Sequence, residues 1–163
     1  MATFLQLLKE TAARCGEAFA LKWTDVDLVN NAVRITPEKS SNPRMFKVSN
    51  KLASMLANLH KKSITVFGYK SKFYLRKAFM KQRKRIAHKL GNPRIHQIHF
   101  HTLRHWKATM EYHKTKDILY VMQLLGHKNI KNALIYIQLA EMISRKQMST
   151  SARLQAHWMK RRL

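Results

Sequence analysis

Apolar residues recur at helical spacing at the start of the chain and alternate with polar residues further along. The first segment predicts a helix that begins almost at Met1 and runs toward Ala13. Between Trp23 and Ser49, short alternating runs are separated by Asn-Asn and Ser-Ser-Asn-Pro turns. This alternation predicts an antiparallel sheet of about three strands.

Helical spacing returns after the predicted sheet. Ser49 or Asn50 can cap one helix, and Ser71 can cap a longer one that runs to Leu90. The apolar stripe of the longer helix is predicted to consist of Leu75, Phe79, Ile86 and Leu90. Further helices are predicted from near Thr102, over residues 118–125 with a stop at Gly126, and over residues 129–139. The expected fold class is mainly α with one small antiparallel sheet.

The length of 163 residues fits one domain, which is predicted to cover residues 1–141. Residues 142–163 form a basic C-terminal tail, which either docks on a partner subunit or is a disordered end. The abrupt helical start suggests a fragment of a longer protein. Cys15 is the only cysteine, which excludes an intramolecular disulfide framework. No signal peptide and no apolar run of roughly 18 residues is visible, so we expect a chain that works inside the cell without a membrane partner.

Charge gives the first indication of function. Thirty-two Lys and Arg residues face eight Asp and Glu residues, a formal net charge of +24. Such a chain attracts polyanions, and phosphate neutralisation supplies most of the non-specific affinity for nucleic acid. The charge therefore favours nucleic acid as the partner over an ordinary basic protein or a protein that binds anionic membrane, and the resemblance described below implies double-stranded DNA. The helix after Ser71 is expected to face it through Arg76, Lys77, Lys81, Lys84 and Arg85.

Four local motifs combine the residue types that phosphodiester cleavage without a metal needs. They are Arg14 beside Gly16, Lys39 at a hairpin turn, His101-Thr-Leu-Arg104-His105, and Leu-Gly-His127 with Tyr136 nine residues later. An Arg donates two hydrogen bonds to a phosphate and stays charged, and a His moves protons near neutral pH. A Lys can act as a general acid and a Tyr as a covalent nucleophile. Each residue alone has an ordinary structural explanation, so the prediction rests on their combination.

The spacing within these motifs supports a single phosphate site. His101 and Arg104 are three positions apart at the predicted start of a helix, so they share a face there. The N-terminus of a helix also favours an anion. His127 follows Gly126 at a helix end, which holds it close to a rigid element.

The joint pattern resembles the tyrosine recombinase, or phage-type integrase, family. The corresponding stretches are AARCGEAFALKW, TPEKSSNPRMFKV, HTLRHWKAT and LLGHKNIKNALIY. The resemblance covers residues Phe4 to Glu141, and the spacing of 23 residues from Arg104 to His127 agrees with the family. The segment from His101 to His127 looks most like integrases of archaea and their mobile elements. The family resemblance implies the fold of its catalytic domain.

The resemblance also implies a role for each cation. Arg14 and Arg104 would hold the scissile phosphate. His101 and His127 would hydrogen-bond it and assist proton transfer. Lys39 would protonate the leaving 5′ oxygen.

The remaining motif residues would supply the nucleophile and its support. Tyr136 would form a 3′-phosphotyrosine link and free a 5′ hydroxyl, while Glu17 and His105 would support the site. A 5′ hydroxyl of a second duplex would then attack the link. The strands are thereby exchanged for DNA integration or excision without ATP, metal or another cofactor.

The family further implies self-association on DNA, with a tetramer in the full recombination complex. The place of action would be the DNA in the cytoplasm, in the host cell if a virus encodes the protein. Family members usually carry a separate N-terminal domain that clamps the far face of DNA, and 163 residues leave no room for it. We therefore expect cleavage from this chain rather than sequence-specific recombination.

Three other functions stay open on the sequence alone. A type IB topoisomerase uses a similar site to relax supercoils. A DNA-binding module with a vestigial site would have the same charge, although all six expected side chains are present. A zinc site is a third hypothesis, because four histidines lie between His96 and His105, but no Cys or Asp joins them.

Overall fold

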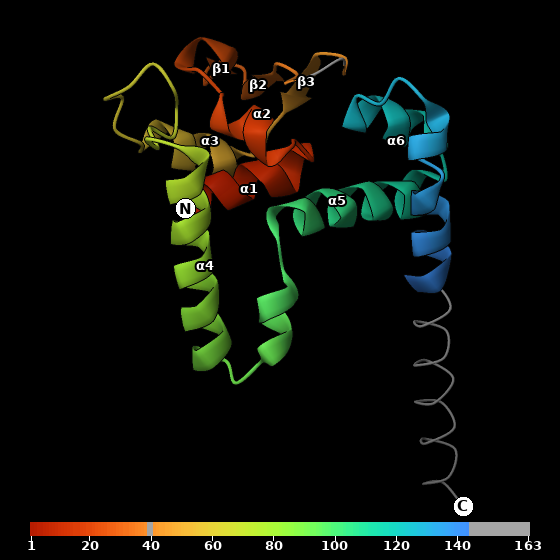
Figure 1. Cartoon of the computed structure of the whole chain (residues 1–163). Coiled ribbons are helices and arrows are strands. Elements are labelled where there is room, and N and C mark those ends of the chain that lie inside the picture. Colours follow the sequence, from red (N-terminus) through yellow and green to blue (C-terminus); the bar gives the residue numbers. More distant parts are fainter. Residues whose placement is uncertain (39–40, 144–163) are drawn as a thin grey trace, which may run out of the picture.

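The computed structural model describes residues 1–38 and 41–143 (Figure 1). Its elements are α1 (Ala2–Thr11), α2 (Cys15–Phe19), the 3-10 helix η1 (Trp23–Asp25), β1 (Val26–Asp27), β2 (Ala32–Ile35), β3 (Arg44–Lys47), α3 (Asn50–Ala57), α4 (Lys72–Lys89), η2 (Pro93–Gln97), α5 (Phe100–Thr115), α6 (Ile118–Leu125) and η3 (Ile130–Asn132). Residues 135–143 are also helical. The predicted class, mainly α with a small antiparallel sheet, is confirmed.

The sheet forms where the alternation predicted it. Its strand order is β1-β2-β3, and both pairs are antiparallel. Val33 lies opposite Phe46, and Ile35 lies opposite Arg44. Val33 and Ile35 are fully buried while Arg34 between them is exposed, as the period of two requires.

Two apolar clusters hold the helices together. In the first, Phe4 and Leu7 of α1 are buried with Ile35 of the sheet and Leu56 of α3. The second cluster joins the end of α1 to α5, α6 and the last helix. It contains Ala12, Ala108, Val121, Leu125, Ala133 and Tyr136. Half of these residues are alanines, so the backbones of these elements can approach closely.

Figure 1 shows α4 and the helix of residues 135–143 extending on opposite sides of the molecule, with α5 between them. Ser71 caps α4 as predicted, since its Oγ accepts a hydrogen bond from the Tyr74 amide. The predicted apolar stripe is wrong over the second half of α4. Ile86 and Leu90 are exposed there, and Ala87 is buried instead. At this end α4 packs on η2. Because η2 is short, it covers only a narrow face of α4 and leaves Ile86 and Leu90 exposed.

The helix with the His-x-x-Arg-His motif begins at Phe100, earlier than the predicted start near Thr102. The Thr102 hydroxyl accepts a hydrogen bond from the His99 amide (3.0 Å), so Thr102 satisfies the end of the helix from within its first turn. The ring of Phe100 packs against Phe79, with centroids 4.4 Å apart, and anchors this turn to α4.

The continuous helix predicted over residues 129–139 is also wrong. Asn129 accepts a hydrogen bond from the Lys131 amide (2.9 Å), which favours the short 3-10 helix η3. The α-helix begins only at residue 135 and continues to residue 143, past the predicted domain boundary at 141. The rest of the predicted tail, residues 144–163, lies outside the described residues. Within the described part of the chain, no helix is long and apolar enough to span a membrane.

Candidate active site

Arg14 is held at the junction between α1 and α2. Ala12 ends α1 in a left-handed conformation (φ 52°), which turns the chain sharply. Glu17 accepts hydrogen bonds from the Arg14 amide (2.8 Å) and from its Nη1 (3.0 Å). Nη1 also donates to Ser41 Oγ (2.7 Å). These contacts fix the guanidinium, although a third of the side chain stays exposed.

Arg104 lies near the start of α5 and is only 2% exposed. Its Nη1 donates to the carbonyl of Ala12 (2.5 Å), and its Nη2 donates to the carbonyl of Leu125 (2.8 Å). The two carbonyls belong to the ends of α1 and α6, where carbonyl groups lack helical partners and carry partial negative charge. Arg104 therefore joins three segments that are far apart in the sequence.

His127 is fixed by the end of α6. Gly126 adopts a left-handed conformation (φ 67°), and the His127 amide donates to the Met122 carbonyl (3.0 Å). His127 Nε2 lies 3.2 Å from Arg104 Nη2. Because a guanidinium can only donate, Nε2 is the acceptor and the ring proton is on Nδ1. Nδ1 is buried and has no partner among the described residues.

The pKa of His127 is strongly shifted. Burial lowers this pKa to about 4, and the charges of Arg104 and Arg14 contribute. His127 is therefore neutral at pH 7.

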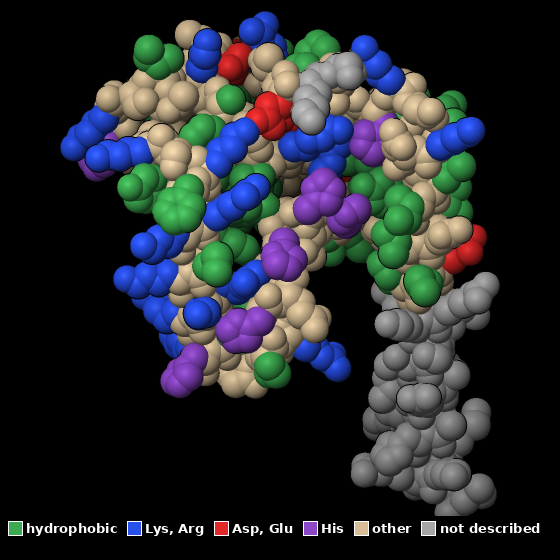
Figure 2. Space-filling view, in the orientation of Figure 1, with side chains coloured by type: hydrophobic (Ala, Val, Ile, Leu, Met, Phe, Trp, Pro, Cys, Tyr) green, Lys and Arg blue, Asp and Glu red, His purple; other side chains and the backbone are tan. Residues whose placement is uncertain are grey.

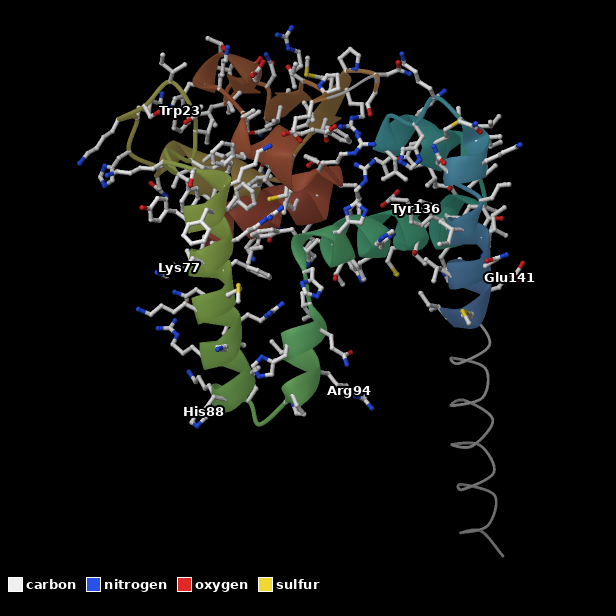
Figure 3. All side chains as sticks on the ribbon, in the orientation of Figure 1. Trp23, Lys77, His88, Arg94, Tyr136 and Glu141 are labelled. Atoms are coloured by element: carbon white, nitrogen blue, oxygen red, sulfur yellow. The ribbon has the colours of Figure 1, made fainter. Side chains whose placement is uncertain are left out.

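The other histidines of the motif connect the cations to Tyr136. The ring centroids of His101 and His105 are 4.6 Å apart, and those of His105 and Tyr136 are 5.7 Å apart. Burial lowers the pKa of both histidines, and nearby positive charge adds to the effect. Tyr136 is 2% exposed, and burial raises the pKa of its phenol, which Arg104 and Arg14 oppose. Figure 3 labels Tyr136 beside α5.

A pocket of about 420 Å³ opens between Arg14 and His127, and Ser41 also lines it. Guanidinium and hydroxyl groups at its wall are suited to an anion. Lys39, the predicted general acid, precedes Ser41 by two positions and lies outside the described residues. Its place in the site therefore stays a prediction. The structure brings the other five predicted catalytic residues together.

Arg44 is a buried cation that belongs to none of the sequence motifs described above. On β3, its Nη2 donates to Glu17 Oε2 (2.6 Å) and its Nη1 donates to the Leu125 carbonyl. These partners are 27 and 81 residues away, so only the fold brings them together. One signal was available, because alternation places Arg44 on the same face as the inward residues Phe46 and Val48.

Three guanidinium groups therefore lie close together, and two of them pair with one buried carboxylate. Arg14 and Arg44 pair with Glu17, and Arg104 shares the Leu125 carbonyl with Arg44. Burial and the charges of Arg14 and Arg44 lower the pKa of Arg104 to about 10, so Arg104 remains charged at pH 7. A bound anion relieves the repulsion among these cations. The arrangement can bind a phosphate and stabilise negative charge that develops on its oxygens.

The five residues predicted to face DNA are all exposed on α4. Arg76 lines a second pocket, of about 520 Å³, together with Cys15 and His101. Arg83 lines it too, although it was not among the residues predicted to face DNA. The other four predicted residues, Lys77, Lys81, Lys84 and Arg85, do not line this pocket. Figure 2 shows basic side chains along α4 and histidines between this helix and the centre of the molecule.

The histidines of the zinc hypothesis do not converge. His96 lies on η2, and His99 Nδ1 lies 3.3 Å from Arg83 Nη1. His101 and His105 face one another instead. Across residues 1–38 and 41–143, no group of three or more His, Cys, Asp or Glu side chains is placed to hold a metal ion. The zinc hypothesis therefore has no site in the described structure.

The shifted pKa of His127 predicts an acid-sensitive fold. Between pH 6.5 and about 4 the unfolded chain takes up a proton at this position and the folded chain does not, so acidification favours unfolding. Because the ring is partly solvated, we expect acidification to lower the free energy of unfolding by about 1 kcal/mol, or Tm by roughly 2–4 °C.

Thermal melting at pH 7.5 and pH 5 measures this loss. His127→Gln should reduce the acid-induced loss, and His60→Gln, at an exposed position outside the site, should not. An equal loss in both variants contradicts the prediction.

Comparison with known proteins relates this site to one family. The sequence model of the Phage integrase family matches residues 1–142. Tyrosine recombinase XerA of Saccharolobus solfataricus is 28% identical over 138 residues, which cover 83% of this chain and 44% of XerA. A tyrosine recombinase of Pseudothermotoga lettingae is 30% identical over 143 residues, which cover 84% of this chain and 49% of that protein. The chain thus spans about half the length of these relatives.

Solved structures give the same assignment. XerH site-specific recombinase, in a post-cleavage complex with its palindromic difH substrate, matches with a TM-score of 0.68 and 25% identity over 90% of this chain and 44% of that chain. The catalytic domain of bacteriophage HP1 integrase matches with a TM-score of 0.63 and 25% identity over 85% of this chain and 74% of that chain. The fold is that of tyrosine recombinase catalytic domains. With the family match over residues 1–142, this shows that the chain belongs to the phage integrase family.

Proposed function

We propose that this chain is the catalytic domain of a site-specific DNA recombinase that cuts and rejoins strands through a 3′-phosphotyrosine intermediate. One observation carries the proposal: Arg14, Arg104, His127 and Tyr136 come from four different segments and lie close together, with Arg14 and His127 lining a pocket suited to an anion. The domain assignment covers residues 1–141.

In this mechanism the cations bind the scissile phosphate. Arg14 and Arg104 hold its non-bridging oxygens and neutralise the charge that develops during attack. His127 lines the pocket beside Arg14, and its contact with Arg104 holds its ring in place there. Glu17 keeps Arg14 in place, because it binds both the amide and the guanidinium.

The attack forms a bond between Tyr136 Oη and phosphorus and breaks the bond from phosphorus to the 5′ oxygen. The raised pKa of Tyr136 keeps its phenol protonated at pH 7, so a base must accept the proton. His101 and His105 are suited to this role because burial lowers their pKa and they form a ring pair next to Tyr136. Lys39 protonates the departing 5′ oxygen.

The proposed substrate is double-stranded DNA, bound in part by the exposed basic residues of α4. Arg76 lines a pocket together with His101, which connects this surface to the catalytic site. Recombination further requires self-association on DNA, which we propose to be a tetramer, with residues 142–163 as the segment that docks on a neighbour. The place of action is the DNA in the cytoplasm.

The role of Lys39 predicts a rescue by substrate chemistry. Lys39→Ala should cleave an ordinary strand very slowly, because the 5′ alkoxide needs a proton to leave. A strand with sulfur at the 5′-bridging position leaves as a thiolate with a pKa of about 8.5, which needs no proton. Single-turnover cleavage of both strands should therefore show a large defect only for the ordinary one.

Lys47→Ala is the matched control, because it removes a neighbouring lysine from β3. It should cleave both strands at the parental rate. If Lys39→Ala is equally slow on both strands, Lys39 is a binding residue and another group donates the proton.

Two experiments separate this function from its alternatives. A covalent adduct with a nicked duplex, seen on a denaturing gel, distinguishes cleavage from a DNA-binding module with a vestigial site. Relaxation of supercoiled plasmid without strand exchange would favour topoisomerase chemistry instead. The relatives named above are recombinases, which favours strand exchange.

A further inference from the structure

A charged side chain is buried between the catalytic segments although the proposed mechanism gives it no role. Arg44 is 8% exposed, and both terminal nitrogens of its guanidinium point inward, to Glu17 and to the Leu125 carbonyl. Its Nε is also buried, without a partner among the described residues. Burial of an incompletely paired cation is costly. Packing alone therefore does not explain an arginine here.

Each contact of Arg44 leads to a residue of the site. Glu17, which accepts from Arg44 Nη2 at 2.6 Å, also holds Arg14 through two hydrogen bonds. The Leu125 carbonyl accepts from Arg44 and from Arg104. Arg44 therefore contacts, through one intermediate group each, both of the arginines proposed to bind the phosphate.

The turn that carries His127 is packed directly against Arg44. A Cβ atom on Gly126 would lie 3.0 Å from Arg44 Nη1 and 3.0 Å from the Asn42 carbonyl oxygen. The Asn42 amide donates to the Gly126 carbonyl (3.3 Å). The end of α6 is thereby attached to the connection between β2 and β3, which contains Lys39 in the sequence.

We propose that Arg44 is a positioning residue that sets the relative placement of Arg14, Arg104 and the His127 turn, an inference that rests on the proposed function. A planar guanidinium can bind a carboxylate and a carbonyl at a fixed separation. An ammonium group is a point charge on a flexible stem and cannot hold both partners in this geometry. A misplacement of about 1 Å at a reacting centre can cost about 10²-fold in rate.

The test compares Arg44→Lys with Arg34→Lys, the same replacement on the neighbouring strand. Arg34 pairs with Asp25 at the surface, and its side chain is 61% exposed. The readouts are the rate constant and the amplitude of adduct formation on saturating nicked duplex, together with the Kd for DNA. All are measured at a temperature well below the Tm of each variant. We expect Arg44→Lys to react about 10²-fold more slowly with unchanged amplitude and Kd. Arg34→Lys should match the parent chain.

Three outcomes overturn the inference. One is a parental rate constant in Arg44→Lys. Another is a lower amplitude at an unchanged rate constant, since this indicates a role in folding alone. The third is rescue of Arg44→Lys by the 5′-bridging-thio strand, which would place Arg44 at the leaving group.

A second variant protects the test against misfolding. If Arg44→Lys does not fold, Arg44→Gln is measured in the same way, because its amide can reach only one of the two acceptors. The same loss of rate is expected, and a parental rate overturns the inference. Absence of any adduct from the parent chain is a different result: it contradicts the proposed function, and the inference falls with it.

Discussion

The Tyr136→Phe variant is expected to form no covalent adduct with DNA while it keeps the fold and the DNA affinity of the parent chain. The substitution removes one hydroxyl and leaves the ring in its cluster with Val121 and Leu125. No hydrogen bond to this hydroxyl occurs among the described residues, so its loss should cost little stability. A denaturing gel after incubation with nicked duplex measures the adduct, and thermal melting measures the fold.

Two other tyrosines serve as matched controls. Tyr112 packs against the same cluster, and Tyr120 is exposed on α6. Tyr112→Phe and Tyr120→Phe should each form the adduct at the parental rate.

The Kd of Tyr136→Phe for DNA should match the Kd of the parent chain at low and at high salt, because phosphate contacts made by cations determine the salt dependence. An adduct that persists in Tyr136→Phe would show that another residue is the nucleophile.

Arg104→Met should slow cleavage by roughly 10³-fold or more, because loss of a preorganised donor to a developing oxyanion has about this effect. The structure adds a second consequence. The buried carbonyl of Ala12 loses its donor, at about 1–3 kcal/mol, while the Leu125 carbonyl keeps its hydrogen bond from Arg44. A clear drop in Tm should therefore accompany the loss of activity, so both must be measured at a temperature where the variant is folded.

Arg104→Lys and the thio-substituted strand separate these two effects. Lys retains the positive charge but lacks the planar group that binds both carbonyls, so DNA binding should survive while cleavage stays slow. The 5′-bridging-thio strand should not rescue either variant, because Arg104 acts on the non-bridging oxygens. Rapid cleavage by folded Arg104→Met would contradict the role of this arginine.

The residues of the site could be predicted where the chemistry depends on local spacing. The His-x-x-Arg-His motif lies within one helix, and Gly126 fixes His127 through a local turn. The alternation between Trp23 and Ser49 likewise predicted the sheet, because period-two patterns depend only on neighbouring residues.

The contacts between distant segments could not be predicted in this way. Arg44 looks like an ordinary strand residue until the fold places it against Glu17 and Leu125. The exposure of Ile86 and Leu90 has the same origin, because the periodicity of a helix shows which residues share a face but not what covers that face. The burial of Arg104 was also unforeseen, since its carbonyl partners lie 92 and 21 residues away.

The most direct test of the account is to identify the residue that becomes attached to DNA. The chain is incubated with a nicked duplex that traps the cleaved state, digested with a protease, and the DNA-bearing peptide is sequenced by mass spectrometry. We predict a 3′-phosphate ester on Tyr136 and a free 5′ hydroxyl on the released strand. Attachment at any other residue, or a 5′-linked adduct, would contradict it.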